Sequence, residues 1–396
     1  MQGQNGLQPF SGGDILFHMK PHYPEKAKVF YLEADSYDRV IAVSDLHGHK
    51  KEFNGLIKHL NLWAEGSRDI LIIAGDILEK GPDILGLLRQ VMELCGEGKA
   101  VLCAGNNDVI FDRWQEGCFS DEEVLTYTQK TEFSILTELA RELGASCNTL
   151  EDVQALRPRI FEHFSREIEF LHGLPHIIDS PFAVFVHGGI RPGTPLEEQD
   201  AEECISVIEF AAQKGPYEKP VVVGHWPASN YCDGQIVVSP YHNREANIIA
   251  IDGGMGLKTW QQINYIIFNK DGSSEEGYYD ELPKIRALDP QGEAEDPFTL
   301  IFSHTMLEVR RGPEKGMCLC YVPYLDRELN IKEDQIYEYK GKTYCYDVTT
   351  YTVPCEAGEI LSFCETQDEG VLVKKEGRVG MYYGRWEFID QRQKGE

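Results

Sequence analysis

The chain lacks any long uninterrupted run of apolar residues, although 42% of its 396 residues are hydrophobic. A helix that crosses a membrane needs about 20 consecutive apolar residues, so we expect no membrane span. No charged segment followed by an apolar one opens the chain, so we expect no secretory signal and a cytoplasmic protein. With this length and apolar content, the chain can bury a sizeable core and is expected to hold two domains.

Paired cysteines and basic residues are also scarce. The eleven cysteines include no Cys-x-x-Cys pair, and Cys318 and Cys320 are too close in sequence to bridge across one strand. This pattern is typical of reduced thiols in a cytosolic protein. The chain has 38 lysines and arginines against 65 aspartates and glutamates, which gives a net charge of −27. Nucleic-acid backbones and anionic membranes would be repelled, so we expect neither as a partner.

What the chain does have is a series of five short apolar runs, each followed at once by a polar residue able to bind a metal ion. The first run, residues 40–44, precedes Asp45 and His47. The other four lead to Gly75-Asp76, Gly105-Asn106, His187 and Gly224-His225. Because helical stretches such as 51–62 and 82–95 separate the first runs, the pattern predicts strands of a largely parallel sheet.

The carboxyl ends of the strands in such a sheet meet at one edge, where open α/β sheets bind their ligands. One fragment of this kind would usually be an ordinary turn, but five in series predict a metal site. Carboxylate, imidazole and amide oxygen suit Mn²⁺, Fe or Zn²⁺, and no set of thiolates competes with them. The predicted ligands are Asp45, His47, Asp76, Asn106, His187 and His225.

Together these fragments resemble the motifs of the calcineurin-like metallophosphoesterases, over about residues 38–270. The matching motifs are Asp45-Leu-His47-Gly, Gly75-Asp76-x4-Gly81, Gly105-Asn106-x-Asp108, Val186-His187-Gly-Gly and Gly224-His225. Within the superfamily, the chain looks closest to the serine/threonine phosphatases and the symmetrical diadenosine tetraphosphatases. Trp226 after the last motif, followed by Ile251-Asp252-Gly-Gly, is more similar to the tetraphosphatase version.

The resemblance implies a four-layer α/β/β/α sandwich that holds two divalent metal ions, with Mn²⁺ favoured and Fe or Zn²⁺ as alternatives. Asp45, His47 and Asp76 would hold the first ion, and Asp76 would bridge to a second ion. The further ligands of that second ion would be Asn106, His187 and His225. The implied reaction is hydrolysis of a phosphomonoester or phosphoanhydride by attack of a metal-bridging hydroxide. Its substrate would be a phosphoprotein, a nucleotide polyphosphate or another phosphorylated small molecule.

Two motifs depart from the family pattern. Glu79 and Lys80 stand where the family has Asp and Arg, and Lys80 is predicted to bind phosphate as a point charge. Asn107 replaces the His that serves the family as general acid. An amide does not titrate usefully, and loss of general-acid help costs about 10²–10⁴-fold in rate. A nucleotide polyphosphate leaves more readily than a serine alkoxide, which slightly favours small-molecule substrates.

Further candidates for catalysis come from the same loops. Asp108 belongs to the third motif, His49 is the nearest residue in sequence that could replace the missing acid, and Arg191 could reach a phosphoryl oxygen. Arg113 and Arg244 are weaker phosphate-binding candidates, because ordinary surface salt bridges are the more common role. The alternative function is a catalytically weakened protein that binds or senses phosphate compounds and uses its C-terminal β domain for recognition.

The sequence predicts an N-terminal extension over residues 1–37, a catalytic domain over 38–288 and a small β-barrel-like domain over 298–396. A helical insertion at about 115–172, which begins with a capping box at Ser120–Glu123, lies between the third and fourth motifs. We expect the insertion to form its own packed core and to shape the substrate pocket. After a polar, turn-rich segment, short strands with little helical period predict an all-β domain.

Three aromatic residues of this β domain have two interpretations. Tyr382, Tyr383 and Trp386 lie in a stretch that faintly resembles a Src-homology-3-like barrel. Aromatic residues in strands are most often core and edge residues of the sheet. The alternative is that they line a groove for a partner peptide.

Overall fold

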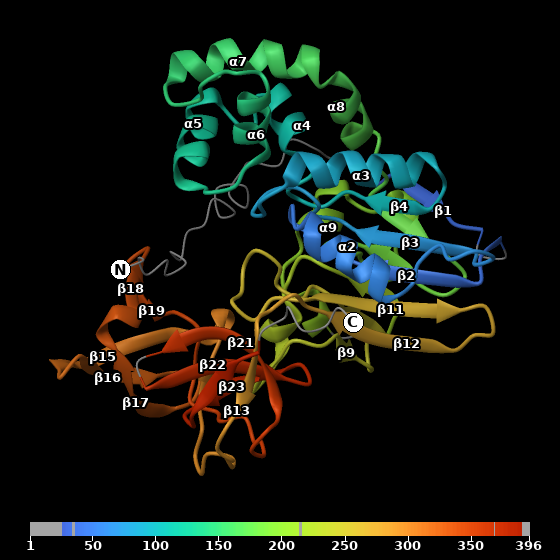
Figure 1. Ribbon diagram of the computed structural model, residues 1–396. Helices are drawn as coiled ribbons and strands as arrows, with labels where there is room; N and C mark the ends of the chain where they lie inside the picture. Colours follow the sequence, from blue (N-terminus) through green and yellow to red (C-terminus); the bar gives the residue numbers. More distant parts are fainter. Residues whose placement is uncertain (1–25, 34–35, 214–215, 368, 390–396) are drawn as a thin grey trace. The chain divides into compact units, whose positions relative to one another are not determined.

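The structure is a computed structural model that describes residues 26–33, 36–213, 216–367 and 369–389 (Figure 1). The described chain divides into two compact units. The first unit contains the residues up to Ala228 together with Ser239–Glu281, and the second contains Ser229–Val238 and the residues from Leu282 onward. The predicted domain limits at residues 37, 288 and 298 remain predictions.

The first sheet of the first unit carries three of the predicted motifs at the ends of adjacent strands (Figure 1). Its strands, in spatial order, are β12 (Ser274–Tyr279), β11 (Ile263–Asn269), β2 (Arg39–Val43), β3 (Asp69–Ala74) and β4 (Ala100–Cys103). β2, β3 and β4 run parallel, whereas β11 pairs antiparallel with both β2 and β12. β3 is buried at every position, as its almost continuous apolar sequence predicts.

The second sheet of the first unit carries the remaining two motifs. In spatial order its strands are β1 (Val29–Tyr31), β5 (Ile177–Asp179), β6 (Val184–Val186), β7 (Val221–Val223), β10 (Ile248–Ala250) and β9 (Tyr241–Asn243). β6, β7 and β10 run parallel, so their carboxyl ends lie at one edge. β1 falls inside the predicted N-terminal extension and pairs parallel with β5, which makes it part of this sheet.

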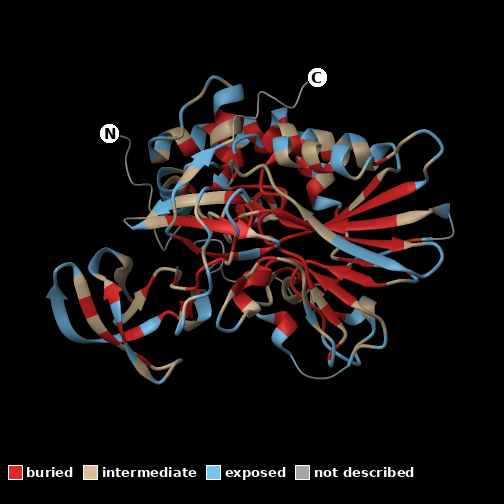
Figure 2. Ribbon diagram, turned by 60° about the horizontal axis from the view of Figure 1, so that its bottom comes forward, coloured by how far each residue is buried: buried red, intermediate tan, exposed pale blue. Residues whose placement is uncertain are grey.

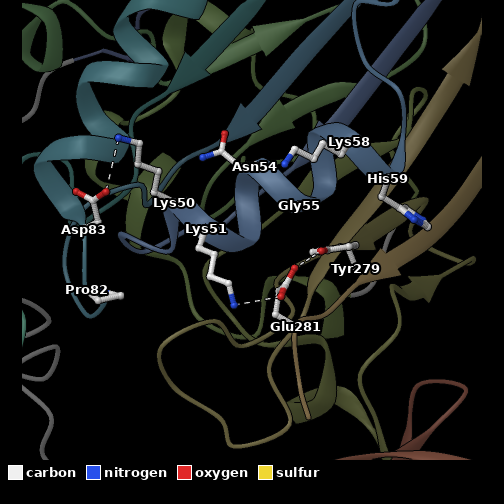
Figure 3. Close-up of a pocket in the computed structure, with 10 residues that line it drawn as sticks. All are labelled: Lys50, Lys51, Asn54, Gly55, Lys58, His59, Pro82, Asp83, Tyr279 and Glu281. Atoms are coloured by element: carbon white, nitrogen blue, oxygen red, sulfur yellow. Dashed lines mark hydrogen bonds and ion pairs between the residues drawn. The ribbon is translucent and has the colours of Figure 1, made fainter. Parts of the chain in front are cut away.

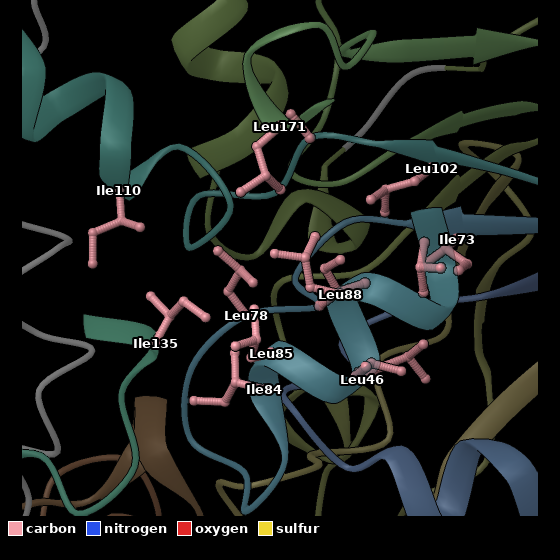
Figure 4. Packing of buried hydrophobic residues seen from close by; sticks show 14 of the residues in the cluster. Leu46, Ile73, Leu78, Ile84, Leu85, Leu88, Leu102, Ile110, Ile135 and Leu171 are labelled. Carbon is pink, nitrogen blue, oxygen red and sulfur yellow. The ribbon is translucent and has the colours of Figure 1, made fainter. Parts of the chain in front are cut away.

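The two sheets share one buried cluster, and helices cover their outer faces. Ala42 and Ile72 of the first sheet pack in the same cluster as Phe185 and Val222 of the second. On the outer face of the first sheet, α2 (Lys50–His59) and α3 (Ile84–Gly96) bury their apolar sides in another cluster (Figure 4). A short helical segment at Phe210–Ala212 contacts the second sheet. Figure 2 shows the buried residues concentrated along the strands. This is the predicted α/β/β/α arrangement.

The helical insertion follows the third motif. Its helices are α4 (Ile110–Gln115), α5 (Asp121–Lys130), α6 (Ile135–Glu142), α7 (Leu150–His163) and α8 (Ser165–His172). The capping box predicted at Ser120 is confirmed, since its side chain accepts from the Glu123 backbone and the Glu123 side chain accepts from the Ser120 backbone. Trp114, Phe119 and Tyr127 are fully buried in the cluster that also covers α3. The insertion therefore packs as part of the first unit.

The second unit consists mainly of strands, as predicted, and its sheets bury two separate cores. The barrel-like shape of the domain remains a prediction. One sheet has the order β24 (Trp386–Phe388), β13 (Lys284–Ala287), β21 (Ile360–Gln367), β22 (Gly370–Lys375), β23 (Arg378–Tyr382) and β8 (Ile236–Val237). Another has the order β17 (Arg327–Lys332), β16 (Met317–Val322), β15 (Met306–Glu314), β19 (Lys342–Cys345) and β18 (Ile336–Tyr339). β14 (Thr299–Leu300) pairs with β20 (Val348–Thr349). Each larger sheet buries its own apolar cluster.

The three aromatic residues singled out in this unit separate into two environments. Tyr382 is fully buried, and its hydroxyl donates to the backbone carbonyls of Asp289 and Arg385. Tyr382 is therefore a core residue and cannot line a groove. Tyr383 is about half exposed, and Trp386 packs its ring against Phe363.

Two further features concern the cysteines and the helices. All eleven cysteines are free thiols in the structure. Among the described residues, no helix combines the length and apolar character that crossing a membrane requires.

The core of the first sheet provides a test of stability. Ile73 of β3 is fully buried, so Ile73→Ala should lower the free energy of unfolding by about 2–5 kcal/mol through lost burial and the cavity that remains. Ile208 is 52% exposed, and the same substitution there should cost less than about 1 kcal/mol. Denaturant unfolding of both variants would measure the difference. Equal losses would contradict the burial assigned to β3.

Candidate metal centre

The predicted ligands are delivered by five loops, each at the carboxyl end of one strand. β2, β3 and β4 present Asp45, His47, Asp76 and Asn106, and the parallel pair β6 and β7 presents His187 and His225. All six side chains are buried. Ligand atoms of Asp45, His47 and Asp76 all lie within 4.8 Å of one another, as a metal site requires. The structure thus brings these three together as the sequence predicted.

The loops that carry the ligands have strained backbone. Asp45, His47, Asp76 and His225 adopt positive φ angles of 51°, 41°, 56° and 67°. A non-glycine residue in this region costs on the order of 1–3 kcal/mol and persists only where its surroundings fix it. Here the first two loops bond to each other, because the Asp45 amide donates to the Gly75 carbonyl (3.0 Å) and the His47 amide to the Asp76 carbonyl (3.0 Å). Such strain is typical of functional sites.

Two motif glycines leave space for the carboxylates. A Cβ atom on Gly105 would lie 2.2 Å from Asp76 Oδ1, and one on Gly224 would lie 2.3 Å from Asp45 Oδ2. Any side chain at either position would therefore displace a predicted ligand. This close approach explains why a glycine precedes Asn106 and His225 in the sequence.

Two histidines are oriented so that Nε2 faces the site. The Nδ1 atoms of His47 and His187 each lie 2.9 Å from a backbone carbonyl, of Leu78 and Ala74 respectively. A carbonyl only accepts, so each Nδ1 carries a proton and each Nε2 faces the site. Burial and the nearby Lys80 ammonium lower the pKa of His47 to about 3, which keeps this ring neutral.

Asp76 lies between two groups of donors. Its Oδ2 is 3.6 Å from His47 Nε2, and its Oδ1 is 3.4 Å from His187 Nε2. His187 Nε2 is also 3.0 Å from Asn106 Oδ1, and its ring centroid lies 5.0 Å from that of His225. Each oxygen of Asp76 therefore faces a different set of ligands.

The electrostatics of the cluster favour an added cation. Burial opposes ionisation of Asp76, but His187 and His47 hold its pKa well below the usual range. Burial and the neighbouring Asp252 carboxylate raise the pKa of Asp45 well above its ordinary value. Although burial disfavours a charged ring, Asp76 and Asp45 raise the pKa of His187 to about 10. With Asp76 ionised, ionisation of Asp45 is therefore unfavourable unless a further cation is present. This donor set thus fits a metal ion.

Unsatisfied buried atoms support the same conclusion. Asn107 Oδ1 and Asp252 Oδ2 are buried and have no hydrogen-bond partner among the described residues. Buried polar atoms without a partner are rare in folded proteins and usually mark an ion, a water or a ligand. The orphaned atoms thus fit a site that receives metal and its bound solvent.

Asp108, predicted as a catalytic residue, forms hydrogen bonds with backbone amides. Its carboxylate accepts from the amides of Gly105 (2.9 Å), Asp76 (2.8 Å), Ile77 (3.0 Å) and Leu78 (3.2 Å). It therefore fixes the third-motif loop to the loop that carries Asp76. In this structure Asp108 positions the ligands, and its oxygens are occupied by these four bonds.

Asn107 and Lys80 both lie at the centre of the site. The Asn107 amide donates to Asp76 Oδ1 (2.9 Å), and its side-chain nitrogen donates to Asp76 Oδ2. The Lys80 ammonium lies 3.0 Å from His47 Nε2. Both predicted residues thus reach the ligand cluster.

His49 and Arg191 are placed differently from the ligands. The Nδ1 atom of His49 lies 2.7 Å from the His47 carbonyl, and burial lowers the pKa of His49, which disfavours the protonated form that a general acid needs. Arg191 pairs with Glu203, and its side chain is 58% exposed. Among the described residues, no hydrogen bond or ion pair joins Arg191 to a predicted ligand. Of the weaker candidates, Arg113 pairs with Glu202 at 2.7 Å and Arg244 is exposed.

Asp252 was not among the predicted site residues, yet it lies close to them. It follows β10, the parallel neighbour of β7, so it reaches the same sheet edge as His225. Its Oδ1 accepts from the Gly254 amide (2.7 Å), and its charge acts on Asp45. The signal that could have identified it is an apolar run followed by an acid, similar to the signal that precedes the predicted ligands.

A separate groove of about 820 Å³ lies along α2 (Figure 3). Lys50 pairs with Asp83 at 3.6 Å and Lys51 pairs with Glu281 at 3.2 Å within it. None of the six predicted ligands lines this groove among the described residues. Its exposed ion pairs are those of an ordinary surface, so the candidate site stays at the sheet edge.

A family model for the calcineurin-like phosphoesterases matches residues 38–251, more than half of the chain. This range contains all five motif loops. The chain belongs to the calcineurin-like phosphoesterase family. The resemblance stated from the motifs is thereby confirmed. Phosphoesterases of this family depend on metal, and the buried cluster of Asp45, His47 and Asp76 is the candidate site.

Two curated relatives share the symmetrical bis(5'-nucleosyl)-tetraphosphatase name. The protein of Nitrosospira multiformis is 35% identical over 182 residues, which cover 46% of this chain and 53% of that protein. The protein of Buchnera aphidicola subsp. Schizaphis graminum is 39% identical over 67 residues, which cover 17% and 23%. The chain therefore spans about half or less of the length of these relatives.

Solved structures of phosphatases were also found. A crystal structure of a proposed diadenosine tetraphosphatase has 20% identity and a TM-score of 0.42, covering 64% of this chain and 99% of that one. A protein serine/threonine phosphatase from Saccharomyces cerevisiae has 11% identity and a TM-score of 0.41, covering 68% and 87%.

The buried Glu79 predicts a pH dependence of stability. Burial raises its pKa to about 7 from 4.5, although Tyr127, Ile135 and Ser134 donate to it and Lys80 lies nearby. The folded state thus keeps a proton that the unfolded state loses, so stability should fall by about 3 kcal/mol as pH rises from about 4.5 to 7. Glu79→Gln should remove this component. Urea unfolding at several pH values, with chelator, would measure it, and parallel curves for both proteins would contradict the raised pKa.

Proposed function

We propose that the protein is a dinuclear metal-dependent phosphoesterase that hydrolyses phosphoanhydrides or phosphomonoesters, with nucleotide polyphosphates as the favoured substrate class. The observation that carries the proposal is the carboxylate of Asp76, which directs one oxygen to each of two groups of buried donors. Membership of a phosphoesterase family supports hydrolysis of a phosphoric ester bond as the activity.

The ligands divide naturally between two ions. Asp45, His47 and Asp76 would hold the first, and Asp76 would share the second with Asn106, His187 and His225. Two divalent ions supply a low-pKa water and neutralise charge on the phosphoryl oxygens. The oxygen and imidazole donors suit Mn²⁺, and they also accept Fe or Zn²⁺.

The protein's own residues contribute substrate binding and orientation. Lys80 is the cation at the centre of the site, and its ammonium would contact a phosphoryl oxygen as a point charge. Asn107 donates both of its nitrogens to Asp76 and so fixes the bridging carboxylate. Asp108 keeps these two loops together through its four backbone bonds.

The substrate class is inferred from the inability of Asn107 to protonate a leaving group. An amide gives no proton to a leaving oxygen, and burial lowers the pKa of the neighbouring His49, which disfavours its protonated form. A substrate whose leaving group is already a stable anion needs the least help, and a nucleotide phosphate is such a group. The names of the two curated relatives support the same class. Phosphoprotein substrates are the second choice, because their alkoxide leaving groups need a proton.

A second candidate function is binding without turnover. The replacement at Asn107 favours it, because it removes the acid and leaves the ligands in place. In that case the protein would sense a phosphate compound, with the strand-rich second unit as the recognition element and a peptide as its partner. Turnover of a phosphate panel decides between the two functions.

Substitution of the shared ligand gives a first test. Asp76→Asn should lower the rate of phosphate release from diadenosine tetraphosphate in Mn²⁺ by at least about 10³-fold, because the Asp76 carboxylate would be shared by both ions. Calorimetric titration with Mn²⁺ should show two ions for the wild type and a loss of binding for the variant. Ile208→Ala, at an exposed position that carries no charge, serves as the control and should behave as the wild type. Metal-independent turnover would refute the proposal.

Restoring the acid gives a second test. Asn107→His should raise kcat on a phosphoserine peptide by about 10-fold or more and change turnover of diadenosine tetraphosphate much less, because only the alkoxide needs a proton. The ratio of the two rates, measured at saturating substrate, is the readout. An equal change on both substrates would show that Asn107 does not select the leaving group.

A further inference from the structure

The turn that carries Lys80 has a backbone that it would not adopt alone. Glu79 and Lys80 are consecutive non-glycine residues with φ angles of 66° and 65°, both in the left-handed region. Side chains disfavour this region, so two such residues in a row require external support. Gly81 follows at once, and a Cβ there would lie 1.9 Å from the His47 carbonyl, so the turn presses against the first-motif loop.

The support comes from the helical insertion. The Glu79 carboxylate accepts from the Ile135 amide (3.0 Å) and from the Tyr127 hydroxyl. The Lys80 amide donates to the Phe133 carbonyl at 3.2 Å. All of these partners belong to α5, to α6 or to the loop between them. Glu79 and Tyr127 are fully buried, so water does not replace these bonds.

Apolar packing joins the same elements. Leu78, which precedes Glu79, lies in one buried cluster with Ile84 and Ile135 (Figure 4). Ile135 thus contributes both its side chain to this cluster and its amide to Glu79. The insertion and the metal loop meet as one packed region, and Glu79 is the polar connection inside it.

This turn places the Lys80 ammonium 3.0 Å from His47 Nε2. An extended or helical backbone at residues 79 and 80 would direct this side chain elsewhere. Glutamate is one methylene longer than aspartate, and this length lets its carboxylate reach the Tyr127 hydroxyl and the Ile135 amide together. The difference at position 79 noted from the sequence therefore has a structural role.

We propose that Glu79 is a positioning residue through which the helical insertion fixes the Lys80 turn and thereby sets the affinity of the site for the substrate phosphoryl group. This inference rests on the proposed function of Lys80 in phosphate binding. The insertion determines specificity through the backbone that it fixes, in addition to any contact with substrate. Glu79 itself touches neither substrate nor metal.

The test compares Glu79→Ala, Glu79→Asp and Glu79→Gln in the Mn²⁺-loaded full chain. Inorganic phosphate is the probe, titrated by calorimetry, so that no turnover is needed. Glu79→Ala and Glu79→Asp should weaken phosphate binding by about 10-fold or more, as expected when a charged hydrogen bond is misplaced. In Glu79→Gln the amide oxygen can still accept from the Ile135 amide, and the amide nitrogen can donate to the Tyr127 oxygen, so binding should return to within about threefold. In steady-state assays, the first two variants should raise KM more than they lower kcat.

Glu138→Ala is the matched control. Glu138 also connects the insertion to the same region, because its carboxylate accepts from the Ile84 and Leu85 amides at 3.0 and 2.8 Å, but it makes no bond to the Lys80 turn. It should lower thermal stability and leave phosphate affinity within about threefold. Mn²⁺ stoichiometry equal to the wild type in every variant confirms that the site is folded.

The outcomes are distinguishable. Wild-type protein that binds Mn²⁺ but no phosphate would refute the proposed function and this inference with it. Wild-type binding that Glu79→Ala leaves unchanged would overturn the inference alone. If Glu79→Ala and Glu138→Ala lose the same amount of thermal stability, and both lower kcat without raising KM, Glu79 has a purely structural role. Tyr127→Phe, which removes one of the bonds to the Glu79 carboxylate, should lie between the wild type and Glu79→Ala.

Discussion

The burial of the Asp76 carboxylate is the constraint on which the rest of the site depends. An ionised carboxylate inside a protein is stable only when donors and cations surround it. Asn107 donates twice to it, His47 and His187 face its two oxygens, and Gly105 leaves the space that it occupies. Asp108, the strained loops and the sheet edge all serve to bring these groups to one carboxylate.

The sheet-edge positions of the six predicted ligands could be inferred from the sequence because each is defined locally. An apolar run of strand length fixes where the chain ends its strand, and the next polar residue arrives at the common edge. Asp252 follows the same rule after β10. Its place at the same sheet edge was not evident from the sequence, because the antiparallel strand β9 lies between β7 and β10 in the chain. The parallel strands of the first unit were predictable for the same reason, since buried parallel strands have continuous apolar sequences. The four layers were expected from the family resemblance.

What the sequence could not predict depends on partners distant in the chain. Nothing near Arg191 indicates that Glu203 pairs with it, and nothing near Glu79 indicates that Tyr127 and Ile135 donate to it. In the second unit, alternating short strands predicted an all-β region correctly. Their division into two open sheets depends on long-range pairing, such as that between β8 and β23, which local pattern does not encode.

The pairing of β1 with β5 has a consequence for how this domain can be isolated. The family match begins at residue 38, after β1, although β1 covers the open side of β5 through parallel pairing and the Leu32 amide bonds to the Asp179 carbonyl at 2.8 Å. A chain shortened to the matched range would expose the backbone amides and carbonyls of β5 to other molecules. Unprotected strands of this kind can add further strands from neighbouring copies, so such a fragment should self-associate more readily than the longer chain. The residues that cover this strand thus lie outside the region by which the family is recognised.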